Sequence, residues 1–311
     1  MKRPAPRRPN GARNIFGKSI ELAAKIREAE EWAQKYRELE QRLATQGQGE
    51  PLAQLAQALL KEGKLDEAGV ILDRLLDIGE KGVEQTAANH FNRAEVYALQ
   101  FQPHKALPHY EKAYRYRPDN VQYAFRYART LQQQHNYTTA HSVYQEVLTT
   151  YRQLAQANPQ AYLSDVAKTL NNLGLLYSDT QRLSESEQAY QEALAIHRQL
   201  AQANPQAYLS DVAMTLNNLG ILRLDQGNLQ QAQTLIAEAL TLRRALWKHH
   251  AGAYGNDLAQ SLAIEIMILQ RKEEAVTLIC ERLREMGHVA RRESLKQWAK
   301  ERMVQVCKNG Q

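Results

Sequence analysis

The chain has 311 residues, of which 43% are hydrophobic and 24% are charged, an ordinary balance for a soluble protein. Its formal net charge of +6 resides in residues 1–18, which hold six Lys and Arg and no acid, so the remaining charges balance. The two cysteines form no CxxC pair, which excludes a disulfide framework and favours a reducing compartment. Without an apolar run of roughly 18 residues or a signal-peptide core, a cytoplasmic protein with no membrane span is expected.

Two segments precede any repeat. Residues 1–18 combine Pro, Arg and Gly with little to bury, so we expect a disordered basic tail there. Apolar residues then recur at alternating spacings of four and three, which predicts an amphipathic helix within residues 19–48. This helix could pack on the first repeat, dimerise as a short coiled coil, or link to a partner.

The chain repeats itself between Tyr151 and Leu222. Residues 152–167 (RQLAQANPQAYLSDVA) are identical to residues 198–213, and the match continues at an offset of 46 residues through TLNNLG. Self-similarity at a fixed period of 20–50 residues indicates a solenoid. Asn-Pro steps inside the identical stretch disfavour helix, so we expect the extra residues of each long repeat to connect successive hairpins.

Shorter copies fit a helix–turn–helix template of 34 residues, in which small and large residues alternate at fixed offsets. The template positions of two copies are His90, Arg93, Ala94, Tyr97, Ala106, Tyr110 and Pro118, then Ala124, Tyr127, Ala128, Leu131, Ala140, Tyr144 and Val147. The small residues let the two helices of a hairpin cross closely, and the large ones fill the groove between hairpins.

These positions make the chain resemble the tetratricopeptide repeat family over roughly residues 49–285. The long copies, in which LNNLG ends at Gly174 and Gly220, look like kinesin-light-chain repeats. The resemblance implies an all-α, right-handed superhelical solenoid of about six helix-turn-helix hairpins. A sixth copy is expected at about residues 254–285, with a turn near Gln270–Lys272 that is about three residues short, and a capping helix at residues 286–311.

No motif carries catalysis or a cofactor. Residues 12–19 (ARNIFGKS) match a loose phosphate-loop pattern, but a working loop needs a preceding strand, and the residues before it cannot supply one. The histidines show no metal-ligand spacing, and neither cysteine has an evident base partner. We therefore expect no enzyme, no metal and no cofactor.

The candidate site is the groove that the first helices line in this family. Its expected residues are Asn92, Arg126, Arg129, Asn171, Asn172, Asp179, Asn217, Asn218 and Asp225. Carboxamides can donate to and accept from the backbone of a bound peptide, and arginines can grip a carboxylate or phosphate. Simple solvated helix faces, or hydrogen bonds between repeats, are the alternative for the same residues.

The expected function is a non-catalytic scaffold or adaptor that binds a partner peptide or helix, in the manner of a sensor or regulatory arm beside an effector enzyme. Two alternatives remain open. The basic tail could attract nucleic acid, although it lacks interleaved aromatic residues, and the helix within residues 19–48 could drive self-assembly.

Overall fold

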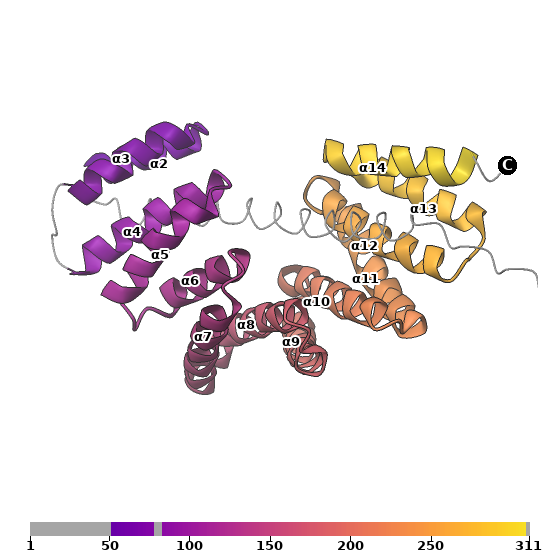
Figure 1. Ribbon diagram of the computed structural model, residues 1–311, viewed down its shortest axis with the longest axis horizontal. Coiled ribbons are helices and arrows are strands. Elements are labelled where there is room, and N and C mark those ends of the chain that lie inside the picture. Colours follow the sequence, from indigo (N-terminus) through magenta and orange to yellow (C-terminus); the bar gives the residue numbers. More distant parts are fainter. Residues whose placement is uncertain (1–50, 78–82, 309–311) are drawn as a thin grey trace, which may run out of the picture. The chain divides into compact units, whose positions relative to one another are not determined.

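The computed structural model describes residues 51–77 and 83–308, which form thirteen α-helices and a final π-helical turn without any strand (Figure 1). The helices are α2 (Pro51–Lys61), α3 (Leu65–Asp77), α4 (Val83–Leu99), α5 (Pro103–Tyr116), α6 (Val121–Gln133), α7 (Tyr137–Ala157), α8 (Pro159–Asp179), α9 (Leu183–Ala203), α10 (Pro205–Asp225), α11 (Leu229–His249), α12 (Ala251–Arg271), α13 (Val276–Val289) and α14 (Glu293–Met303), followed by η1 (Val304–Lys308). The expected tail and N-terminal helix lie outside the described residues.

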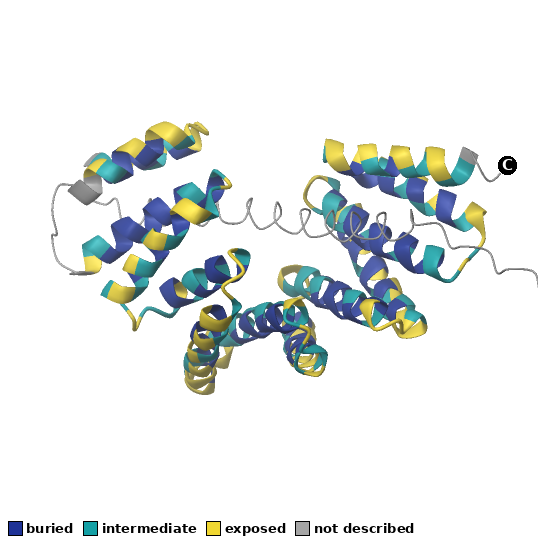
Figure 2. Cartoon of the chain, in the orientation of Figure 1, coloured by how far each residue is buried: buried dark blue, intermediate teal, exposed yellow. Residues whose placement is uncertain are grey.

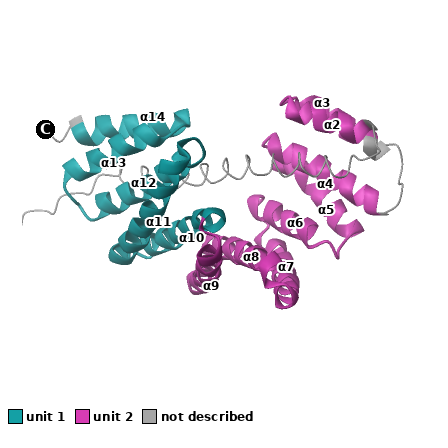
Figure 3. Ribbon diagram, turned by 180° about the vertical axis from the view of Figure 1, so that it is seen from behind, with its two compact units in different colours: residues 1–29, 206–311 teal, residues 30–205 magenta. Residues whose placement is uncertain are grey.

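The described residues divide after Pro205 into two compact units (Figure 3). The N-terminal unit holds α2 to α9, in which each helix packs against the next. The C-terminal unit holds α10 to α14 and η1. We number the hairpins in chain order, from hairpin 1 (α2 and α3) to hairpin 6 (α12 and α13), so the expected six hairpins are confirmed.

Asparagines stand at helix boundaries in the long hairpins. Asn158 ends α7, where its backbone N–H donates to Leu154 O over 2.9 Å, and it begins α8 by accepting from the Ala161 N–H over 3.3 Å. Pro159 follows as the first residue of α8, where a missing N–H costs nothing. The prediction that the extra residues connect hairpins is therefore wrong: the connection is one residue, and the extra residues lengthen the helices to 21 residues.

Buried residues run along the helices of every hairpin (Figure 2), and one of them, a large side chain, occupies the same position on the second helix of four hairpins. Tyr110, Tyr144 and Tyr190 occupy it in hairpins 2 to 4, and Ile236 takes it in hairpin 5. Opposite the last two are Gly174 and Gly220 on the first helices. The absence of a Cβ lets each pair of helices cross closely, as the repeat template predicts.

Each hairpin turn contains one residue with a positive φ. These residues are Gly63, Phe101, His135, Gln181, Gly227 and Glu273, with φ between 55° and 78°. Glycine reaches this left-handed conformation without steric cost, whereas the other four residues hold it against their Cβ. The last four positions follow the period of 46 residues, so the turns share one geometry despite different side chains.

Hairpin 6 keeps the register of the long repeats. Ala251 begins α12 46 positions after Pro205 begins α10, and the turn residue Glu273 lies 46 positions after Gly227. The prediction of a shortened turn is wrong, because the turn occupies 272–275 and is not contracted. The predicted cap also begins later, since α13 continues to Val289 before α14 starts.

Candidate partner-binding surface

Three positions on the first helix of hairpins 2 to 5 include seven of the nine residues that the sequence singled out, and we call these positions the first-helix stripe. They are spaced i, i+3 and i+7 and therefore share one face of a helix. The stripe consists of Asn92, Glu95 and Leu99 in hairpin 2; Arg126, Arg129 and Gln133 in hairpin 3; Asn172, Leu175 and Asp179 in hairpin 4; and Asn218, Ile221 and Asp225 in hairpin 5.

In hairpin 2 the stripe is buried. Glu95 is 0% exposed and accepts a hydrogen bond of 2.5 Å from the Tyr110 hydroxyl. Arg126, on the next first helix, places its Nε 3.4 Å from the same carboxylate, and its side chain is 12% exposed. The expectation that Asn92 lies on an exposed face is wrong, because the helices around it close over this level of the repeat.

Hairpins 3 and 4 carry the accessible part of the stripe in the N-terminal unit. Arg129 and Asn172 are half-buried, and Asp179 is exposed. Gln132 Nε2 donates to Asp179 Oδ2 over 3.2 Å, which links the ends of α6 and α8. The structure thus brings the predicted residues of these two hairpins onto adjacent helices.

The two asparagines of hairpin 4 differ in environment. Asn172 donates from Nδ2 to Lys168 O over 2.8 Å within its own helix and stays partly exposed. Asn171, one residue earlier, points into the packed interior and is buried. An exposed face cannot include both residues, because neighbours on a helix point about 100° apart.

In the C-terminal unit the corresponding asparagines are both interior. Asn218 is 5% exposed, and Asn217, with its amide oxygen toward Arg243, accepts from Nη1 and Nη2 over 3.2 and 3.3 Å. Ser261 Oγ lies 3.1 Å from the same amide. The expected exposed ladder of asparagines is therefore wrong for these two residues, whereas Asp225 is exposed as expected.

Sequence reasoning missed a second series at the period of 46 residues, formed by Tyr151, His197 and Arg243 on the second helices. All three are buried, and His197 is 0% exposed. Burial, aided by the charge of Lys168, lowers the pKa of His197 to about 4. Arg243 instead donates to Asp257 O and to Gln260 Oε1. Aligning the copies at this offset would have revealed the series.

His90 was expected to pack in the interior, and it does so beside a second histidine. The Nδ1 atoms of His90 and His109 lie 3.0 Å apart between α4 and α5. Burial lowers the pKa of His90. Burial followed by the charges of His90 and Arg93 lowers the pKa of His109 to about 4. One imidazole therefore donates to the other while both are neutral.

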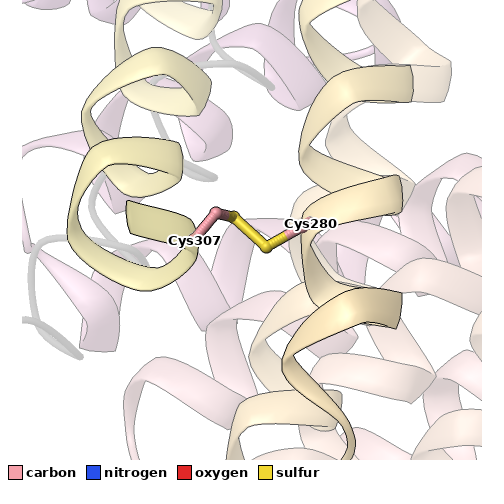
Figure 4. The surroundings of a disulfide bond; sticks show 2 residues. All are labelled: Cys280 and Cys307. Carbon is pink, nitrogen blue, oxygen red and sulfur yellow. A yellow bond between two sulfur atoms is a disulfide. The ribbon is translucent and has the colours of Figure 1, made fainter. Parts of the chain in front are cut away.

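The two cysteines correct another expectation. Cys280 on α13 and Cys307 in η1 form a disulfide, with Cα atoms 6.0 Å apart (Figure 4). The sequence excluded a disulfide framework but did not foresee this single bond, which is possible because α13, α14 and η1 pack together and bring the cysteines within bonding distance despite 27 residues of separation.

Residues 51–77 and 83–308 contain no group of three or more His, Cys, Asp or Glu side chains arranged to hold a metal ion. None of the helices described is long and apolar enough to span a membrane.

Solved structures share the fold at low sequence identity. A chain of the APC/C hetero-tetramer Cut9-Hcn1 aligns over 89% of this chain and 47% of its own length, at 16% identity and a TM-score of 0.55. BtubC from P. vanneervenii aligns with 71% of this chain and 91% of its own, at 22% identity and 0.54. A putative kinesin light chain from Podosopora anserina aligns with 63% of this chain and 94% of its own, at 14% identity and a TM-score of 0.52.

No curated protein sequence matches this chain. Two family models, both described as tetratricopeptide repeat, match residues 49–119 and residues 128–160, 166–206 and 212–246. The matched residues lie in hairpins 1 to 5 and include most of both long copies. The chain belongs to the tetratricopeptide repeat family, whose members act as scaffolds for protein–protein interaction.

Proposed function

We propose that the chain is a non-catalytic adaptor whose N-terminal unit holds a peptide or helix of a partner protein on the first-helix stripe of hairpins 3 and 4. The observation that carries the proposal is the contrast along the stripe. The same positions are buried in hairpin 2 and accessible on α6 and α8, where polar side chains line two adjacent helices.

The chemistry of these side chains suits a polypeptide ligand. Asn172 uses one amide hydrogen inside its helix, and its Oδ1 accepts no hydrogen bond from the described residues, which leaves this oxygen for a partner's backbone N–H. Arg129 is half-buried, with its Nη2 atom in the interior, and adds a positive charge that attracts an acidic group of the partner. Leu175 follows Asn172 by three residues on the same face of α8, is half-buried, and offers apolar contact.

Arg126 has a different role in this proposal. Its contact with Glu95 already occupies one edge of the guanidinium, and Glu95 is fixed in turn by Tyr110. We assign Arg126 to positioning α6 against hairpin 2 rather than to direct ligand contact. Asn92, Asn171, Asn217 and Asn218 likewise support the packing of their hairpins.

The test is capture of the partner by the full chain from its native cells, followed by affinity measurement with the purified partner. A variant carrying Arg129→Glu and Asn172→Asp should bind at least about tenfold more weakly, since each change removes a complementary group at the surface. Gln153→Glu, an exposed change on the second helix α7, is the matched control and should bind normally. Equal binding by all three proteins would exclude the stripe.

A regulatory arm beside an effector enzyme remains our proposal for the cellular role. The captured complex tests it directly, because an effector should co-purify and change activity when the stripe variant replaces the wild-type chain. A partner without catalytic activity would limit the proposal to scaffolding.

The compartment is also a proposal, and the cysteines offer its test. The Cys280–Cys307 disulfide would not persist in a reducing cytoplasm, so a cytoplasmic chain should carry both cysteines as thiols when cells are quenched with acid and labelled under denaturing conditions. Two labelled cysteines support the cytoplasm, and an unlabelled chain that becomes labelled only after reduction contradicts it.

A further inference from the structure

The C-terminal end of the described chain closes the last hairpin with a cover instead of another repeat. Helix α14 and η1 both pack against α13, the second helix of hairpin 6 (Figure 1). Leu295 and Ala299 of α14 are 0% exposed and belong to one apolar cluster with Leu283 and Met286 of α13. A solenoid repeat is stabilised only by its neighbours, so the outer side of hairpin 6 depends on this cover.

The start of the cover is held by a side chain of α12. Asn256 accepts hydrogen bonds through its Oδ1 from the backbone N–H groups of Arg291 and Arg292, over 3.1 and 3.2 Å. These bonds fix the turn between α13 and α14, and Leu295 then buries the first turn of α14. The start of the cover therefore has anchors that do not involve sulfur.

The far end of the cover is held by the disulfide. Here η1 is more open, because Val304 is 48% exposed and Val306 is only partly buried against the core. Cys307 lies in η1, and its bond to Cys280 ties this last turn to α13 across 27 residues of sequence (Figure 4). A cross-link stabilises the closed arrangement by removing conformations from the open chain. Loss of the bond should therefore release η1 while the start of α14 stays in place.

The two sulfurs differ in access to solvent. Cys280 is 5% exposed, whereas Cys307 is partly exposed. In the reduced chain, the Cys307 thiolate can attack glutathione disulfide, which forms a mixed disulfide and releases one glutathione thiolate. The Cys280 thiolate then attacks Cys307 Sγ, closes the internal bond and releases the second glutathione. The two protein thiols thus lose two electrons and two protons, which glutathione disulfide takes up as it becomes two thiols.

We infer that Cys280 and Cys307 form a redox-controlled clasp on the C-terminal cover. Oxidation by a disulfide such as glutathione disulfide locks η1 onto α13, and reduction releases η1 and loosens the outer side of hairpin 6. This inference goes beyond the adaptor proposed above, since it uses no residue of the first-helix stripe and concerns the C-terminal unit alone. It makes the stability of that unit depend on the thiol–disulfide balance of its surroundings.

The experiment compares the full chain in two glutathione buffers, one rich in the disulfide and one rich in the thiol. Intact mass should show the oxidised chain lighter by two hydrogen atoms and free of glutathione. After reduction, the amides of residues 304–308 should exchange with deuterium at least about tenfold faster, whereas residues 291–295 should change little. The thermal midpoint of the reduced chain should fall by roughly 10 °C.

Cysteine variants provide matched controls, because the chain has only two cysteines. Cys307→Ser should exchange like the reduced wild type in both buffers, and Cys280→Ala repeats the test without burying a hydroxyl. The stripe variant should keep the full redox response, so failure of the clasp and failure of the stripe are distinguishable. An oxidised chain that forms only glutathione adducts or intermolecular disulfides would overturn the proposal. An internal disulfide that leaves the exchange of residues 304–308 unchanged would overturn it as well.

Discussion

The first helices of hairpins 4 and 5 are almost identical in sequence, but they pack against different side chains. Residues 159–167 of α8 and 205–213 of α10 are identical, and TLNNLG follows in both. The second helices α9 and α11 present different side chains at equivalent places: Tyr190 and Ile236 at the crossing, and His197 and Arg243 in the interior. The comparison teaches that duplication fixes the helix path, while the interior chemistry depends on the second helix.

The interior position separates the two hairpins most strongly. In hairpin 5 a buried guanidinium has backbone and amide oxygens as acceptors, and Arg243 is 2% exposed. In hairpin 4 the equivalent group is an imidazole whose pKa is lowered by burial and by the charge of Lys168. Hairpin 5 therefore stabilises a cation at this interior position, whereas hairpin 4 disfavours one there.

The largest expected effect therefore comes from His197→Arg. It places a second cation near Lys168 in a fully buried site, and such uncompensated charges cost about 3–5 kcal/mol. The reverse change, Arg243→His, removes donors from Gln260 and Asn217 and should cost about 1–3 kcal/mol. Urea unfolding followed by circular dichroism measures both. Equal losses in the two variants would refute the asymmetry.

Lowering the pH should destabilise hairpin 4 through His197. The unfolded imidazole titrates near 6.5 and the folded one near 4, so the unfolded chain takes up the proton first as pH falls. The contribution of the neutral imidazole to the free energy of unfolding is fully present above about pH 6.5. It is lost as the pH falls to about 4, by up to about 3 kcal/mol.

The control for this pH effect is His197→Tyr, which copies the residue found at Tyr151 in hairpin 3. Urea unfolding at neutral and acidic pH should show a smaller loss in this variant than in the wild type. His109, whose pKa is also lowered to about 4, remains in both proteins and cancels in the difference. Identical pH profiles would rule out the contribution of His197.

A smaller effect is expected at the crossing glycines. A Cβ added at Gly174 would lie 2.7 Å from the ring of Tyr190, which is rigid and buried. At Gly220 the nearest atoms are Cδ1 and Cγ1 of Ile236, at 2.5 and 2.8 Å; Cδ1 can rotate away, but Cγ1 must shift as well. Gly174→Ala should therefore cost about 1–3 kcal/mol, and Gly220→Ala should cost less, because an aliphatic chain yields more easily than a ring and helix propensity offsets part of the crowding.

Thermal melts of these two alanine variants decide the point. A larger drop in Tm for Gly174→Ala supports the account. A larger drop for Gly220→Ala would show that the isoleucine is held as firmly as the tyrosine ring.

The smallest effect is expected in the turns. Gln181 and Gly227 occupy the same left-handed position, with φ of 60° and 78°. Gln181→Gly should stabilise the chain by roughly 0.5 kcal/mol, and Gly227→Gln should destabilise it by about 1 kcal/mol. Chemical denaturation of each single variant measures the change in its free energy of unfolding. A change of the same sign in both variants would contradict the common turn geometry.

The fold was predictable because the repeat template depends on residue size at fixed offsets. Ala106, Tyr110 and Gly174 could be assigned to helix crossings from sequence alone, and the crossings confirm the hairpins. The connecting residues were misjudged because an Asn-Pro step marks a break but not its length. A single Asn158 serves as the end of one helix and the start of the next.

The candidate surface was less predictable, because a polar side chain on a first helix does not reveal which neighbour covers it. Asn172 and Asn218 occupy equivalent positions, yet only the latter is fully buried. The link between Glu95 and Arg126 joins different hairpins and has no local motif. The Cys280–Cys307 disulfide was not predictable for the same reason, since only the packing of the final helices brings the two cysteines together.

The most direct test of the adaptor account is hydrogen–deuterium exchange of the full chain with and without its captured partner. Partner binding to the stripe should slow amide exchange in α6 and α8 and leave the exposed faces of the second helices α7 and α9 unchanged. Protection confined to α7 and α9, or no change in α6 and α8 when the partner saturates the chain, would contradict it.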